Sequence, residues 1–239
     1  MGKVLTILAL TLFGALTLYL PLASPPAIFN TPDENANAFF ARNLAGNGEL
    51  RIREPLEAKV DNAIHPRGVN VVRGFLVPES FLGLPVLYGT ATRFIPFAVP
   101  YILPLFTVGA LLCLFRIFSA FFKRRVAGIA IFLLGSMPAL LYLAGRPLMH
   151  TVAFLDFLII GWWLIFYRTR WDMVAGIFIG AALAMRASEI AWVAAGTAAL
   201  LFLPHRIRGS ARGLKAVIVR LFAFALGTAL IFVPLVFEN

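Results

Sequence analysis

Two adjacent carboxylates, Asp33 and Glu34, open the first long polar stretch of the chain. A carboxylate held beside a substrate hydroxyl can act as a general base, which is the chemistry that this pair suggests. The alternative is local, because Thr31 and Pro32 precede the pair and together have the pattern of a capped helix start. In that case the acidic side chains complement the helix dipole. The pattern predicts a short amphipathic helix over about residues 31–46 and leaves both roles open.

Basic side chains form the second set of candidates for chemistry. Arginine presents a planar fork of donors that matches phosphate oxygens, and histidine exchanges protons near neutral pH. Each residue of the set also has a local explanation, such as a solvated turn or a pair between Arg186 and Glu189. The candidates for substrate binding are His65, Arg67, Arg146, His150 and Arg186.

The composition decides which class of protein must position these residues. Of the 239 residues, 61% are hydrophobic and 13% are charged, whereas a soluble domain has about 25% charged residues. This excludes a soluble globular protein and a disordered chain. The net charge of +10 does not indicate nucleic acid, because the basic residues lie in short clusters between apolar runs. We therefore expect an all-α membrane protein whose basic clusters meet lipid headgroups.

The apolar runs predict seven transmembrane helices in a single membrane domain over residues 1–239. About twenty apolar residues are needed to cross a bilayer, and 4–23 fits an uncleaved anchor, with cleavage near residues 21–24 as the alternative. The run 173–204 is interrupted at Arg186, and the positive-inside rule favours two short helices there because all basic clusters then share one side. The predicted spans are 4–23, 95–118, 126–145, 148–167, 173–186, 190–204 and 216–236.

This topology gives a cytoplasmic N-terminus, an extracytoplasmic C-terminus and a long extracytoplasmic loop over residues 24–94. Loops of that length are uncommon unless they are functional or disordered, and regularly spaced apolar residues predict that this one is partly helical. Asp33, His65, Arg146, His150 and Arg186 all face the same compartment in this arrangement. Ionisable groups that converge on one membrane face form a site hypothesis.

Other residues carry weaker signals. Asp156 lies deep in a predicted span, where a hydrogen bond to a neighbouring helix and a role in transport or catalysis are both open. Cys113 lies in an apolar run and is interpreted as packing. The spacing of Gly176 and Gly180 predicts close helix packing. No metal-binding motif is present in the sequence, and the participation of a divalent ion stays open.

Taken together, these motifs resemble the GT-C superfold of integral-membrane glycosyltransferases. The segment Pro32–Leu44 after a first span, then His65-Pro66-Arg67, then Pro78 to Pro85, is similar to family 39, the protein O-mannosyltransferase and aminoarabinose transferase group. The segment Ala175–Glu189, in which small residues lead to an Arg at the membrane edge, also resembles a family segment.

The resemblance implies an enzyme that moves a sugar, hexose or pentose, from a polyprenyl-phosphate donor to an acceptor hydroxyl on the extracytoplasmic face. Asp33, with Glu34 beside it, takes the place of the family's catalytic carboxylate. Arg186, Arg67 or Arg146 then offsets the charge on the departing lipid phosphate. The acceptor, whether glycan, lipid or protein, is left open.

The chain also departs from the family pattern. Arg67 follows His-Pro where O-mannosyltransferases have a second Pro and a Lys, and His150 stands where relatives often carry an acidic residue. Family members usually continue with further spans, so we expect a short variant, a truncated product, or half of a split enzyme that needs a partner subunit. The rival functions are a non-catalytic GT-C-like subunit and a transporter or flippase, for which Asp156 is the main indication.

Overall fold

The computed structural model describes residues 2–23, 31–56, 59, 66–79, 81–146, 148–167, 171–207 and 214–237. Most of these residues are helical, and a small antiparallel sheet lies in the segment that follows the first helix. The helices are α1 (Gly2–Ala23), α2 (Pro32–Asn47), α3 (Gly83–Phe94), η2 (Pro96–Tyr101), α4 (Ile102–Phe121), α5 (Arg124–Gly135), α6 (Pro138–Ala144), α7 (His150–Tyr167), α8 (Asp172–Met185), η3 (Ala187–Glu189), α9 (Ile190–Ile207) and α10 (Leu214–Phe237). The strands are β1 (Ile52–Arg53), β2 (Val69–Val72) and β3 (Phe75–Pro78), in the order β1-β3-β2.

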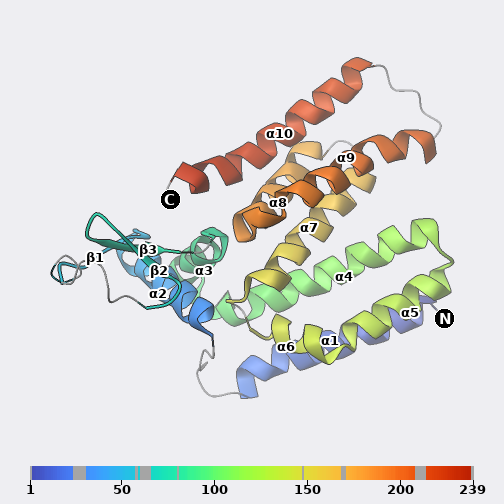
Figure 1. Ribbon diagram of the computed structural model, residues 1–239. Helices are drawn as coiled ribbons and strands as arrows, with labels where there is room; N and C mark the ends of the chain where they lie inside the picture. Colours follow the sequence, from blue (N-terminus) through green and yellow to red (C-terminus); the bar gives the residue numbers. More distant parts are fainter. Residues whose placement is uncertain are drawn as a thin grey trace.

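The molecule has two parts, a stack of long helices and a smaller module at one end of it. In Figure 1 the stack runs from α10 through α8 and α9 to α7, then α4, and finally α5 with α1. The module consists of α2, α3 and the sheet. The first residues of α1 lie at the end of the stack away from the module, whereas α10 ends on the module's side. The described part of the segment predicted as an outer loop therefore forms a folded module at one end of the stack.

The apolar helices are compatible with the all-α membrane protein that the composition predicts. Two segments, Pro96–Phe121 and His150–Tyr167, are long and apolar enough to cross a bilayer, and there are up to four if each of two bent pairs counts as one span. This count covers only the described part of the chain. Shorter apolar stretches occur at Val4–Tyr19 and Ile218–Pro234.

The predicted break in the run 173–204 is present. α8 ends at Met185, Arg186 has a non-helical φ of −153° and ψ of 82°, and the next helical segment is bent away by 116°. The predicted span 126–145 falls on two helices, α5 and α6, which pass the length and hydropathy test together but meet at 61°. Pro138 occupies the first turn of α6, where its missing N–H costs no helical hydrogen bond.

The sheet was not predicted and adds strands to a chain expected to be all-helical. β2 and β3 form a hairpin in which Val72 pairs with Phe75, and the two connecting residues, Arg73 and Gly74, have φ of 53° and 78°. Two positive φ values are typical of a tight turn whose twist matches the strands. The sheet packs on α2 through a small apolar cluster of Ala36, Phe40, Val69 and Leu76.

Close helix contacts in the stack depend on glycine. A Cβ on Gly176 of α8 would lie 2.2 Å from the carbonyl oxygen of Phe224, and one on Gly227 of α10 would lie 2.0 Å from that of Met173. The hydroxyl of Thr228 donates to the carbonyl of Gly176 at 3.2 Å. The packing predicted from the spacing of Gly176 and Gly180 is thus confirmed, and its partner is α10.

Candidate active site

The first turn of α2 positions the acidic pair. Thr31 is the N-cap, its hydroxyl accepts a hydrogen bond from the Glu34 backbone N–H at 3.3 Å, and Gly48 ends the helix with a φ of 78°. The predicted helix and its cap are therefore confirmed. Consecutive side chains on a helix point about 100° apart, so Asp33 is exposed whereas Glu34 is buried.

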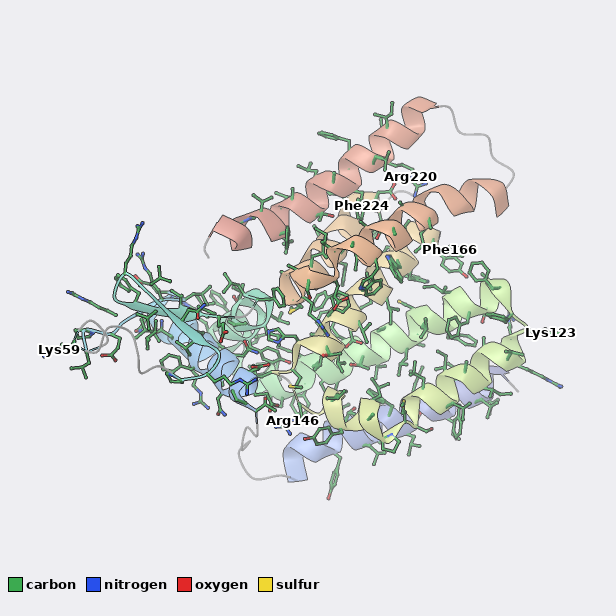
Figure 2. All side chains as sticks on the ribbon, viewed as in Figure 1. Lys59, Lys123, Arg146, Phe166, Arg220 and Phe224 are labelled. Carbon is green, nitrogen blue, oxygen red and sulfur yellow. The ribbon has the colours of Figure 1, made fainter. Side chains whose placement is uncertain are left out.

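Glu34 forms a buried ion pair with Arg146, from the connection between α6 and α7. The Arg146 Nε donates to Oε1 at 2.6 Å, and a terminal nitrogen donates to Oε2. The Thr31 hydroxyl also donates to Oε2, at 3.0 Å, and Tyr142 accepts from Arg146. The Glu34 hydrogen bond raises the pKa of Arg146 above its ordinary value. Figure 2 shows Arg146 where the module meets the stack. The pair ties α2 to the helices.

His150, the first residue of α7, occupies the space between the module and the stack. The Asn37 amide of α2 donates to the Leu148 carbonyl at 3.0 Å and lies 3.4 Å from His150 Nε2. The imidazole also interacts with the Phe81 backbone by a hydrogen bond, and the Phe81 ring packs edge-on at 6.2 Å between centroids. These contacts fix the orientation of the ring.

Asp33 and Arg186, which are far apart in the sequence, both influence this histidine electrostatically. Each lies close enough to interact electrostatically with the imidazole, and the two act with opposite signs. Arg186 is partly exposed and forms an ion pair with Glu189 at 2.9 Å. The indole of Trp192 donates to the same Glu189 carboxylate. The charges of an exposed carboxylate and of a partly exposed guanidinium thus both act on the same imidazole.

Two close backbone contacts hold α3 in the middle of this arrangement. A Cβ on Gly83, at the start of α3, would lie 2.7 Å from the Ala184 carbonyl at the end of α8. A Cβ on Gly89 would lie 2.9 Å from the Ala41 carbonyl of α2. α3 therefore brings the helix that carries Asp33 and the helix end that carries Arg186 to a fixed separation.

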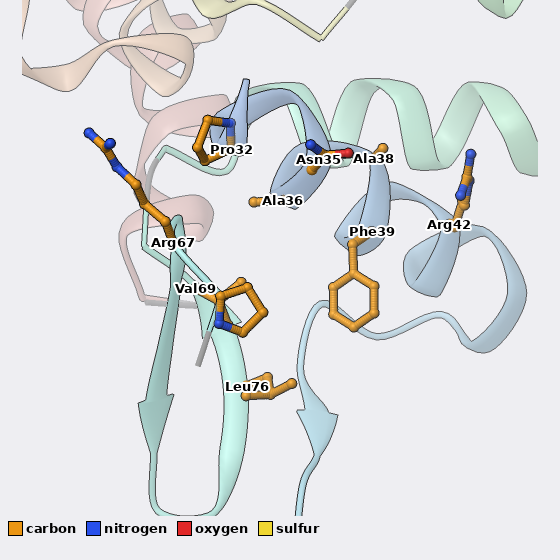
Figure 3. A pocket seen from close by; sticks show the side chains of 10 residues that line it. Pro32, Asn35, Ala36, Ala38, Phe39, Arg42, Arg67, Val69 and Leu76 are labelled. Atoms are coloured by element: carbon orange, nitrogen blue, oxygen red, sulfur yellow. The ribbon is translucent and has the colours of Figure 1, made fainter. Parts of the chain in front are cut away.

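Arg67 lies in a different part of the module, and His65 is outside the described residues. Arg67 is exposed at one end of a groove of about 780 Å³ between α2 and the sheet. Figure 3 shows Arg67 beside Pro32, with Arg42 at the far end and Phe39 between them. The groove begins at the same helical turn that carries Asp33, because Pro32 and Asn35 both line it.

Asp156 of α7 is buried inside the stack. Its carboxylate accepts a hydrogen bond of 2.6 Å from Thr107 of α4, whose hydroxyl is also 3.0 Å from the Leu103 carbonyl. The buried Tyr88 of α3 interacts electrostatically with Asp156, and burial raises the pKa of the Tyr88 hydroxyl. Asp156 therefore has the interhelical hydrogen bond that was one of its two interpretations.

Two buried polar contacts were missed in the sequence, one within this arrangement and one between α8 and α10. Asn37 is the link between α2 and His150, and Asp172 forms a buried bidentate pair with Arg220 at 2.8 and 2.9 Å. A charge within a predicted apolar span, as at Arg220, was the available signal for the second. Asn37 carried none, because a polar residue in an amphipathic helix is ordinary.

Among the described residues, no group of three or more His, Cys, Asp and Glu side chains is placed to hold a metal ion. Comparison with family models, curated proteins and solved structures gives no match to the chain. A function for the chain must therefore be inferred from its own residues, and the candidates are Asp33, His150 and Arg186 at the junction of module and stack.

Proposed function

We propose that the chain is a membrane glycosyltransferase that transfers a sugar from a polyprenyl-phosphate donor to an acceptor hydroxyl on the extracytoplasmic face. One observation carries the proposal: α3 packs directly on both the helix that carries Asp33 and the helix end that carries Arg186, and both charges act on His150, where the polar module meets the apolar helices. A lipid-linked sugar phosphate has an apolar tail and an anionic head, so its reactive bond lies at such a boundary.

In the proposed reaction Asp33 is the general base. It takes the proton of the acceptor hydroxyl while that oxygen attacks the anomeric carbon of the donor sugar. The bond from the anomeric carbon to the phosphate oxygen breaks, and its electron pair leaves with the polyprenyl phosphate. Arg186 is more exposed than Arg146 and pairs with Glu189 through one terminal nitrogen, so its remaining N–H groups donate hydrogen bonds to the phosphate as the phosphate's charge increases. Asp33 suits this role because it is exposed and has no ion pair with a described residue.

Glu34 and Arg146 have a different role in this proposal. Both side chains are already committed to each other, to Thr31 and to Tyr142, so neither is free to act as base or as phosphate ligand. They are positioning residues that fix the first turn of α2 against the start of α7. His150, held by Asn37, then orients the donor phosphate or the Asp33 carboxylate.

The proposed topology has seven spans. In it, α5 and α6 together form one span, whereas α8 and α9 each form a span of their own. The start of α1 is then cytoplasmic, and the module is extracytoplasmic. This orientation is supported by the basic residues Lys123, Arg124 and Arg125, which are exposed at the turn between α4 and α5, since cytoplasmic loops are enriched in Lys and Arg.

The test is a transfer assay in membranes supplied with radiolabelled polyprenyl-phosphate sugars and an acceptor extract. Asp33→Asn keeps the size of the side chain and removes the base, so we expect transfer to fall about a hundredfold or more. Glu49→Gln, which neutralises an exposed carboxylate at the far end of α2's module, is the matched control. Undiminished transfer by Asp33→Asn overturns the assignment, and no transfer by the unaltered chain in any donor combination favours a non-catalytic subunit.

A further inference from the structure

The groove between α2 and the sheet has the composition of a binding site for an anion attached to a ring. Its described lining contains two guanidinium groups and no carboxylate, and its floor is apolar. The lining residues are Pro32, Asn35, Ala36, Ala38, Phe39, Arg42, Pro66, Arg67, Val69 and Leu76. The volume of about 780 Å³ lies within the range of about 300–1,000 Å³ that is usual for small-molecule sites.

The two arginines are available to a ligand. Arg42 and Arg67 are exposed, and neither forms an ion pair with a described carboxylate. This contrasts with Arg146, Arg186 and Arg220, which all have carboxylate partners. The guanidinium N–H groups of Arg42 and Arg67 can therefore donate hydrogen bonds to an anion.

The space between the arginines suits a sugar ring. In Figure 3 Phe39 lies between Arg67 and Arg42 and extends toward the sheet, and an exposed aromatic face packs well against the C–H face of a pyranose. The Asn35 amide nitrogen donates to the Thr31 carbonyl at 3.0 Å, which leaves its oxygen to accept from a hydroxyl. A chain of neutral sugars would use the ring and the amide but would leave both charges unmatched.

We propose that this groove binds an acidic glycan, with ring stacking on Phe39 and with carboxylate or phosphate groups on Arg42 and Arg67. Building on the proposed function, we infer that this glycan is the acceptor. The groove starts at Pro32 and Asn35, on the first turn of α2 that also carries Asp33, so an acceptor that extends past this end of the groove comes near the base.

The experiment measures binding by isothermal titration calorimetry to the full chain in nanodiscs of zwitterionic lipid. The probes are digalacturonate and glucose 1,6-bisphosphate, with maltose as the neutral sugar and inorganic phosphate as the anion without a ring. We expect the acidic sugars to bind more tightly than both comparison probes. Arg42→Gln and Arg67→Gln should each weaken binding about tenfold, the loss of one charge-assisted interaction. Arg73→Gln, in the β2–β3 turn outside the groove, is the matched control and should bind normally.

Several results would overturn the groove assignment. These are equal binding of maltose, equal losses in all three arginine variants, or unchanged binding in both groove variants. If nanodiscs of anionic lipid abolish sugar binding, the groove holds lipid headgroups instead. Asp33→Asn separates this inference from the proposed function, because that variant should bind the acidic probes normally whether or not transfer depends on Asp33.

Discussion

Two buried ion pairs of nearly the same geometry lie in different parts of the described chain. Glu34 with Arg146 joins the module to the stack, and Asp172 with Arg220 joins α8 to α10. In both, the arginine contacts the two carboxylate oxygens. Figure 2 shows the two arginines well separated, with Arg146 beside the module and Arg220 on α10.

Their surroundings differ. Close helix packing surrounds Asp172 and Arg220, with glycines on both helices in backbone contact. Near Glu34 and Arg146 are the exposed carboxylate of Asp33 and the imidazole of His150, on which the charge of Arg186 also acts. A buried ion pair by itself is weak evidence for stability or for function. The comparison indicates that the two pairs differ in their neighbours, and near Glu34 and Arg146 these include the exposed Asp33 and the imidazole of His150, on which our proposal depends.

The largest effect on stability is expected at the pair between α8 and α10. Asp172→Ala leaves the Arg220 charge buried without a partner, which costs about 3–5 kcal/mol. The double change Asp172→Leu with Arg220→Met removes both charges and should restore most of that loss. Thermal unfolding in detergent, followed by circular dichroism, measures both. A loss below about 1 kcal/mol in Asp172→Ala would contradict the assignment of a closely packed, dry pair.

A single and a double substitution at the Glu34–Arg146 pair, matched to those at Asp172 and Arg220, should separate an effect on stability from an effect on activity. Glu34→Ala is expected to cost less, about 1–3 kcal/mol, because Arg146 keeps its contact with Tyr142 and is 13% exposed. Glu34→Leu with Arg146→Met should recover stability but not transfer, since α2 loses its fixed position. Transfer per folded molecule, measured with the radiolabelled donor, distinguishes the two regions. If this double variant and the double variant at Asp172 and Arg220 transfer sugar equally well, the Glu34–Arg146 pair has no role in transfer beyond stability.

Gly83→Ala tests whether α3 sets the distance between Asp33 and Arg186. The added Cβ meets the Ala184 backbone at 2.7 Å, and such overpacking costs about 1–3 kcal/mol. The matched control is Gly46→Ala in α2, where a Cβ has no neighbour within 4 Å, and it should be neutral or slightly stabilising. We expect Gly83→Ala to lower transfer more than its loss of folded protein explains. A proportional loss would assign Gly83 to packing alone.

The smallest effect is expected at the helix cap. Thr31→Ala removes the hydrogen bonds to the Glu34 N–H and to its carboxylate, and loss of such a cap costs about 0.5–2 kcal/mol. Thr31→Ser keeps the hydroxyl and should retain both stability and transfer. If serine fails as alanine does, the methyl group of Thr31 is what matters.

The elements of this fold were predictable where the signal is local. The cap at Thr31, the helix that follows it and the break at Arg186 each follow from a few adjacent residues or from the distribution of basic clusters. The hairpin was missed because Arg73-Gly74 lacks the Asn or Asp that usually marks such a turn, although the alternating residues on either side of it were a usable signal.

The site was predictable only in part, because its contacts join residues far apart in the chain. The topology predicted from the sequence puts Asp33, Arg146, His150 and Arg186 on one membrane face. No local pattern, however, shows that Arg146 forms its ion pair with Glu34 and not with Asp33. Which of two adjacent carboxylates is buried depends on how α2 is rotated about its own axis relative to α7. Tertiary packing sets this rotation.

The measurement that tests the central claim most directly is thiol labelling at position 33. Cys113 is the sole cysteine, so Asp33→Cys in a Cys113→Ser background gives one exposed thiol. A membrane-impermeant maleimide applied from outside intact cells should label it, and added polyprenyl-phosphate sugar should slow the labelling. Labelling only after permeabilisation, or at a rate that the donor leaves unchanged, would contradict the placement of the donor beside Asp33.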